Sequence, residues 1–203
     1  AQHLEIERLL HSALINDEIS LNYQPQVDAD KNVVGAEVLA RWNSEKLGPV
    51  SPAVFIPIAE QTGLIIELGN YILEQSLITL QSWHEKGIPM QHLSINISMR
   101  QFLHNGFVDT VKRLIDLYMD RALCNRLTFE VTESIVAEDI NNVILRMNEL
   151  KALGITIAID DFGIGYSSLT NLWSFPIDTL KIDQSCVQDI DSAPGKAIVQ
   201  TII

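Results

Sequence analysis

Short apolar segments with a strict two-residue alternation constrain the fold of this chain more than any other feature. Four such segments, rich in β-branched residues, alternate with longer stretches of helical period, and they cover residues 93–98, 127–133, 155–161 and 179–183. Strands that alternate with helices are typical of a parallel sheet. Small, polar or ionisable residues take every second position in each segment, so they share one face of the strand. A doubly wound open sheet would be apolar on both faces, so this pattern favours an α/β fold of the (β/α)-barrel type with a polar lumen.

The remaining segments complete a coarse map of the chain. Two strands joined by the polar turn 28–32 are predicted upstream, at 19–27 and 33–42. Helices are predicted at 51–83, with a break at Thr62-Gly63, and at 107–120 and 139–154, where apolar residues recur with helical spacing. About six strand units can therefore be counted in what we interpret as a single domain spanning residues 1–203.

The charge of the chain excludes several kinds of partner. Among 203 residues, 26 are acidic and 14 are basic, which gives a net charge of −12. A net charge of this sign disfavours any partner held by a basic face, such as duplex DNA or an anionic bilayer. Cys124 and Cys186 have no CxxC spacing, so neither a disulfide framework nor a thiolate zinc site is predicted.

No apolar run approaches the roughly 20 residues that a membrane span needs, and the chain begins with Ala1 rather than Met. We interpret it as a cytoplasmic piece of a longer protein, whose remaining parts could carry a membrane anchor or a sensor.

Oxygen donors collect on the polar face of the predicted barrel. They come from different strands, with two more carboxylates at the strand ends, and they are Glu37, Asn96, Glu130, Asp160, Asp161 and Glu133. Converging carboxylates and amides form sites for Mg²⁺, Mn²⁺ or Ca²⁺. A single carboxylate at a strand end would be read as an ordinary solvated side chain, but agreement among the strands favours a metal site.

Two further side chains have two interpretations each, and one turn carries a weak motif. Lys181, on the same face, either forms a structural ion pair or orients a water for attack. Arg41 either reaches a phosphate at the barrel mouth or is an ordinary surface arginine. The glycine-containing turn at 161–168 resembles a dinucleotide loop only weakly. The five histidines are predicted on helices or loops away from the strand ends, and we assign them no chemistry.

Seven motifs, in this order and spacing, resemble the EAL domain of bacterial cyclic di-GMP phosphodiesterases. They are YQPQVD, GAEVLARW, FIPIAEQTGLI, SINISMRQF, FEVTES, IAIDDFGIGYSSL and LKID. The resemblance implies a TIM-like (β/α)8 barrel with an antiparallel first strand, truncated here after about six strand units. It also implies hydrolysis of cyclic di-GMP to linear pGpG with two Mg²⁺ or Mn²⁺ ions, a homodimer, and an upstream sensor or GGDEF domain in the full-length protein.

The resemblance also implies a role for each matched residue. Metal ligands are expected at Glu37, Asn96, Glu130, Asp160 and Asp161; Glu37, Asp161 and Lys181 are the catalytic residues, with Lys181 orienting the water. Gln24 and Arg41 are expected to contact substrate, and Glu133 is expected to steady the loop after Asp161.

The chain departs from the family pattern at three places. Val38 replaces the alanine of the signature, Ile164 replaces a hydroxyl residue, and the chain stops at Ile203, before the strands expected to carry a catalytic glutamate and a glutamine. We therefore expect the 203 residues alone to be inactive. Two other functions remain open: a catalytically inactive cyclic di-GMP receptor that acts through protein partners, and an unrelated metal-dependent barrel enzyme such as an enolase-like lyase.

Overall fold

The computed structural model describes residues 2–137, 139–162 and 174–188. Its helices are α1 (Gln2–Ala13), α2 (Pro52–Thr62), α3 (Ile65–Glu85), α4 (Met99–Leu103), α5 (Phe107–Tyr118), α6 (Ile140–Ala152) and α8 (Gln184–Gln188). Two 3-10 helices are η1 (Arg121–Arg126) and η2 (Glu133–Ala137). The strands are β1 (Ile19–Val27), β2 (Val33–Ser44), β3 (Gly48–Val50), β4 (His92–Asn96), β5 (Leu127–Thr132), β6 (Thr156–Phe162) and β7 (Thr179–Ile182).

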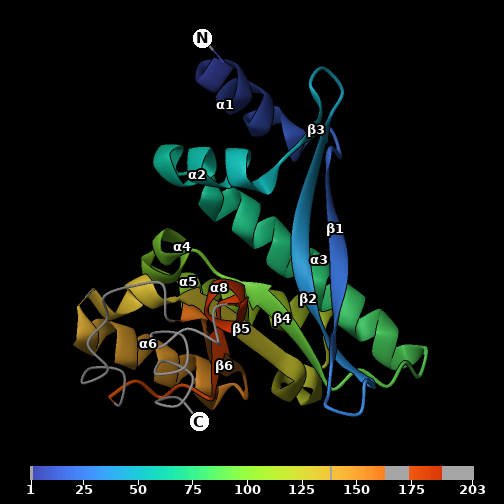
Figure 1. The fold of residues 1–203 in the computed structure, drawn as a ribbon, viewed down its shortest axis with the longest axis vertical. Helices are drawn as coiled ribbons and strands as arrows, with labels where there is room; N and C mark the ends of the chain where they lie inside the picture. Colours follow the sequence, from blue (N-terminus) through green and yellow to red (C-terminus); the bar gives the residue numbers. More distant parts are fainter. Residues whose placement is uncertain (1, 138, 163–173, 189–203) are drawn as a thin grey trace.

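One sheet organises these elements, with the strand order β1-β2-β4-β5-β6-β7 and with β3 paired to β2 (Figure 1). β1 is antiparallel to β2, whereas β4, β5, β6 and β7 each add in parallel to the strand before. β2, β4, β5 and β6 are joined through helices, as the alternation of strand and helix predicts. The order and the antiparallel first strand are those expected of the truncated barrel, and the predicted six strand units are confirmed.

The apolar face of the sheet is covered by α3, α5 and α6. Side chains on this face, such as Ile95, Phe129 and Ile157, are completely buried against those helices. The residues between them, such as Ser94, Glu130 and Ala158, point to the other face. The two faces predicted from the alternation are therefore present, and the polar one is the lumen side of the barrel.

A second, smaller core lies beside the first part of the sheet, where α1 and α2 pack together next to the β1–β2 hairpin (Figure 1). Trp42 and Phe55 meet edge to face there, with ring centroids 5.7 Å apart. The Trp42 indole N–H donates to Glu18 Oε2 (2.9 Å), so its only polar atom is satisfied as it is buried.

The predicted helix 51–83 is interrupted at the predicted place. Gly63 has a left-handed φ of 87° and ends α2, and α3 begins at Ile65. This conformation is strained for any residue with a Cβ, so glycine allows the sharp corner between the two helices. β3 was not predicted, because a three-residue strand with Pro49 in its middle has no periodicity to detect.

One histidine prediction is wrong. His92 is the first residue of β4, not a loop residue, and its Nε2 lies 2.7 Å from Gln26 Oε1 of β1. Its ring covers Gly35 of β2, where an added Cβ would overlap the imidazole. Burial lowers the pKa of His92 below its ordinary value, so the ring is neutral near pH 7.

Both cysteines are free and buried. Among the described helices, none is both long enough and apolar enough to cross a bilayer.

Candidate metal and substrate site

Three carboxylates from three strands converge at the carboxyl ends of the parallel strands. Glu37 of β2, Glu130 of β5 and Asp160 of β6 each place a carboxylate oxygen within 4.8 Å of the other two. Register explains the meeting, because Glu37 aligns with Ser94 of β4, and Asn96, two residues further along β4, aligns with Glu130. A strand interior fixes side-chain direction through its backbone hydrogen bonds, so the three carboxylates are held close despite their repulsion.

Lys181 of β7 sits among these carboxylates. Its Nζ lies 3.3 Å from Glu37 Oε2 and 3.1 Å from Asp160 Oδ2, and it donates a short hydrogen bond to Glu130 Oε2. Three carboxylates and one ammonium leave two formal negative charges, which suits a divalent cation bound to oxygen ligands. The prediction that Lys181 shares a face with the acidic residues is therefore confirmed by geometry.

The charges shift each other's proton affinities. Burial raises the pKa of the Glu130 carboxyl, and Lys181 opposes this rise. Burial alone would lower the pKa of Lys181, but the hydrogen bond to Glu130 and the nearby carboxylates outweigh it and raise that pKa. Lys181 therefore carries a positive charge at neutral pH.

Asn96 and Gln24 flank this group of carboxylates. Asn96, the last residue of β4, donates through Nδ2 to Glu37 Oε1 (2.8 Å). Gln24 of β1 is paired with Glu37 in the antiparallel register, and opposed residues of neighbouring strands point to the same face. The amide of Asn96 is thus beside the carboxylates, and Gln24 is next to Glu37 on the lumen side.

Asp161 breaks the alternation of β6. Its φ is +55°, its backbone N–H donates to Asp160 Oδ1 (2.9 Å), and the register with β7 shifts between Ile159 and Phe162. In a regular strand Asp161 would point away from Asp160. Burial, followed by repulsion from Asp160 and from Asp183, raises the pKa of Asp161, so this carboxylate interacts with the acidic group.

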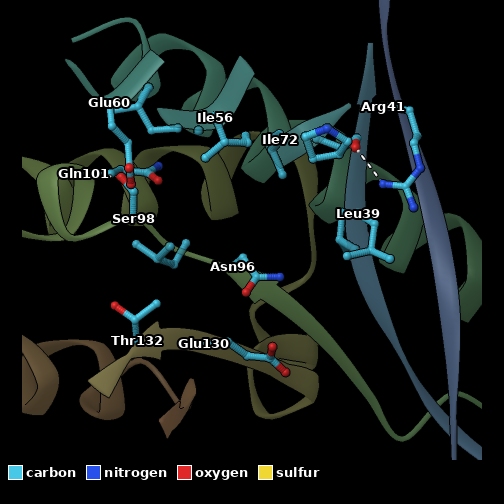
Figure 2. A pocket seen from close by; sticks show the side chains of 16 residues that line it. Leu39, Arg41, Ile56, Glu60, Ile72, Asn96, Ser98, Gln101, Glu130 and Thr132 are labelled. Atoms are coloured by element: carbon cyan, nitrogen blue, oxygen red, sulfur yellow. Dashed lines mark hydrogen bonds between the residues drawn. The ribbon is translucent and has the colours of Figure 1, made fainter. Parts of the chain in front are cut away.

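A pocket of about 370 Å³ adjoins the carboxylates. Figure 2 shows Asn96, Glu130 and Thr132 on one side of it, facing Ile56 of α2 and Ile72 of α3. Gln101, on α4, lines it too, and its Nε2 is buried with no hydrogen-bond partner among the described residues. A mostly apolar hollow that ends in a few polar groups is the usual form of a small-molecule site.

Arg41 and Glu133 lie at the edges of this region. Arg41, near the end of β2, lines the pocket, and its Nη1 donates to the Ala40 carbonyl (2.8 Å) (Figure 2). Glu133 follows β5 and is buried at the start of η2. The loop that Glu133 is expected to steady falls at 163–173, outside the described residues, as does Ile164.

The apolar wall of the pocket was not predicted from the sequence. Ile56 and Ile72 occupy ordinary positions of amphipathic helices, and their periodicity does not distinguish a core face from a pocket face. Gln101 could have indicated the pocket, because it is a polar residue within the otherwise apolar packing face of a short helix. Its burial to 2% exposure makes it an exception among glutamines.

Comparison with known proteins agrees with this geometry. The model of the family described as EAL domain matches residues 7–203. The bifunctional diguanylate cyclase/cyclic di-GMP phosphodiesterase MucR of Pseudomonas aeruginosa is 34% identical over 204 residues, and the cyclic di-GMP phosphodiesterase PdeR of Escherichia coli is 33% identical over 203. Both alignments cover 100% of this chain but 30% of the relative, so the chain spans less than a third of either protein.

Solved structures give the same result. The PaMucR phosphodiesterase in complex with c-di-GMP has a TM-score of 0.90 and 34% identity, covering 98% of this chain and 80% of that chain. The cAMP-bound EAL enzyme Bd1971 has a TM-score of 0.87 and 36% identity, covering 100% and 57%. The Xanthomonas citri FimX EAL domain in complex with c-diGMP, at 23% identity and a TM-score of 0.84 over 99% and 78%, supports the fold alone. The predicted TIM-like barrel, here truncated, is confirmed.

Proposed function

The chain belongs to the EAL domain family, and from this membership we propose that the intact protein hydrolyses cyclic di-GMP to linear pGpG. The observation that carries the proposal is the meeting of Glu37, Glu130 and Asp160 around Lys181, at the end of a pocket large enough for part of a dinucleotide. Relatives named as cyclic di-GMP phosphodiesterases support the substrate.

Two Mg²⁺ or Mn²⁺ ions are the proposed cofactors. Glu37, Asn96, Glu130 and Asp160 would hold one, and Asp161 would contribute to the other. The donor set fits, because carboxylates and an amide oxygen are hard ligands and carry an excess of negative charge. A bound divalent cation supplies Lewis-acid chemistry to the phosphodiester and to the attacking water.

The remaining proposed roles belong to groups of the chain. Lys181, as a cation, orients the attacking water and offsets negative charge as it develops on the phosphate. Arg41 reaches a phosphate oxygen from the pocket edge once its guanidinium leaves the Ala40 carbonyl. Gln24 contacts substrate from β1, and Glu133 steadies the segment that follows Asp161.

The net charge of −12 repels a dianionic dinucleotide, so binding depends on local reversal of that field at the site. Ile56 and Ile72 form an apolar wall against which a nucleobase can pack. We also propose a homodimer, an upstream sensor or GGDEF domain in the full-length protein, and a cytoplasmic location of this domain.

The test is conversion of cyclic di-GMP by the purified intact protein, followed by liquid chromatography with Mg²⁺, with Mn²⁺ and after chelation. We expect pGpG to appear only with the divalent cation. Tight binding of cyclic di-GMP without turnover in either metal would instead identify an inactive receptor. Failure to bind cyclic di-GMP at all would overturn the proposal.

A further inference from the structure

Arg100 joins two helices, α4 and α2, that both contribute residues to the pocket lining. It lies on α4, and its Nη1 donates to the carbonyl oxygens of Glu60 (2.5 Å) and Gln61 (3.3 Å) in the last turn of α2. The last carbonyls of a helix have no partner within that helix, and a cation there also favours the helix dipole. Arg100 therefore acts as an external cap of α2.

The guanidinium of Arg100 lies close to Gly63, in the turn after α2. A Cβ built on Gly63 would lie 3.2 Å from Arg100 Nη2, and the left-handed φ of Gly63 already favours glycine. The guanidinium thus lies directly over the turn between α2 and α3. Arg100 therefore contacts both the last carbonyls of α2 and the turn that follows them.

Both partners of this contact connect to the pocket. α2 contributes Ile56 and Glu60 to its lining, and α4 contributes Gln101, the residue next to Arg100. α4 follows β4 closely in the chain, because its N-cap Ser98, which accepts a hydrogen bond from the Gln101 N–H (3.1 Å), lies two residues after Asn96. Arg100 is exposed and does not line the pocket, so it can influence a ligand only through the helices it joins.

We propose that Arg100 is a positioning residue that fixes the α2 wall of the pocket relative to β4 and α4, and so sets affinity for cyclic di-GMP rather than the rate of the chemical step. This inference rests on the proposed function. Without the cap, α2 remains folded through its core residues Phe55 and Ile58, but its last turn is free to shift. The wall then spends time in positions that do not fit the ligand, which weakens binding in proportion.

Arg146 provides a matched control. It lies on α6 and donates through Nη1 to the carbonyls of Phe102 and His104 (both 2.7 Å), so it also caps a helix end, that of α4. α6 contributes no residue to the pocket lining. Loss of Arg146 removes a cap of the same chemistry from the C-terminal end of α4 and leaves the contact between Arg100 and α2 in place.

The experiment compares wild type with R100A, R100K and R146A in the intact protein. For R100A we expect KM and the Kd for cyclic di-GMP to rise about 5- to 10-fold with kcat within about twofold, since charged hydrogen bonds of this kind are individually modest. R100K should recover part of the affinity, because an ammonium can still donate to the Glu60 carbonyl. R146A should lower Tm at least as much as R100A and leave KM within about twofold.

Hydrogen exchange of the ligand-free protein gives a second readout that does not depend on the proposed function. Amides around Gly63 should exchange faster in R100A than in wild type and R146A. Unchanged exchange there, an unchanged KM in R100A, or an equal rise of KM in R146A would overturn the positioning role. A wild-type protein that does not bind cyclic di-GMP, with faster exchange in R100A, would overturn the proposed function and leave the mechanical role of Arg100 intact.

Discussion

The two ends of the lumen face use polar residues in opposite ways. At the amino ends of the parallel strands they pair off: His92 with Gln26, and Thr128 with Thr156, whose hydroxyl oxygens lie 2.8 Å apart. At the carboxyl ends, three carboxylates share one lysine and keep an excess of negative charge. At the amino end these polar side chains are paired with one another, whereas the carboxyl end keeps negative charge that can bind a cation.

The same period-two pattern runs through both ends, so alternation by itself does not locate function. The excess of negative charge distinguishes the carboxyl end from the amino end, and in this architecture active sites lie at the carboxyl ends of the strands. We call the carboxyl end, with its three carboxylates, the reactive end, and the amino end, with its paired polar side chains, the closed end. The contrast can be tested by substitutions at each end and in the pocket between α2 and α3.

Removing a carboxylate from the reactive end should have the largest effect. E37A or D160A is expected to reduce turnover of cyclic di-GMP at least 10³-fold while the fold is kept, because metal activation of water would be lost. Initial rates of pGpG formation measure this. E45A, at an exposed acidic position just after β2, should retain wild-type rates. Retention of activity in E37A would show that the reactive end is misassigned.

Removing the shared lysine should have the next largest effect. K181A is expected to lower kcat about 10²-fold and to spare affinity for cyclic di-GMP, because Lys181 is proposed to orient the water and not to hold the substrate. Steady-state kinetics and calorimetric binding separate the two quantities. A higher Kd with unchanged kcat would reassign Lys181 as a phosphate contact.

The pocket wall should respond in affinity alone. I56A removes apolar contact surface from the pocket and is expected to raise KM roughly tenfold, the equivalent of one or two buried methylene groups. V54A removes an exposed apolar side chain from the same helix and should leave KM unchanged. Equal effects of both variants would mean that α2 affects binding only through its stability.

The closed end should respond in stability alone, with the smallest effect. H92Q is expected to leave kcat unchanged and to cost about 1 kcal/mol of unfolding free energy, the usual worth of one hydrogen bond. Denaturant unfolding measures it.

The pH dependence gives a sharper form of the same test. Because the pKa of His92 is lowered by folding, the unfolded chain binds the proton more tightly, and wild type loses stability as pH falls below about 6.5. H92Q has no histidine at this position and does not lose stability in this way. The difference in unfolding free energy between wild type and H92Q should therefore become smaller as the pH is lowered from 7.5 to 5.5. A difference that grows on acidification would contradict the neutral, buried histidine.

The fold and most of the reactive end were predictable because both follow from strand periodicity. Once Glu130 and Asp160 alternate with buried residues, their face is fixed by the backbone, and Lys181 follows from the same rule. His92 was missed although it lies two residues before Ser94, a position that places it on the same face. His92 precedes Leu93, the first apolar residue of the segment, so the apolar run by which the strand is recognised does not include it.

Other features depend on side-chain packing and local backbone exceptions, which periodicity does not encode. The left-handed Asp161 contradicts alternation and is visible only once the bulge in β6 is known. The Arg100 cap joins residues 40 positions apart through an exposed side chain, and nothing in the sequence links the two. Prediction therefore succeeded where geometry repeats and failed where it is interrupted.

The position of Lys181 also bears on the order in which the protein is assembled. Three carboxylates brought together without a cation would oppose the pairing of β2, β5 and β6, and a chain that depended on metal for this step would wait for it. Lys181 arrives on β7 as part of the same chain and supplies the missing positive charge. The strands can then pair before any of the proposed metal ions binds. Binding and release of metal would not require the strands to separate.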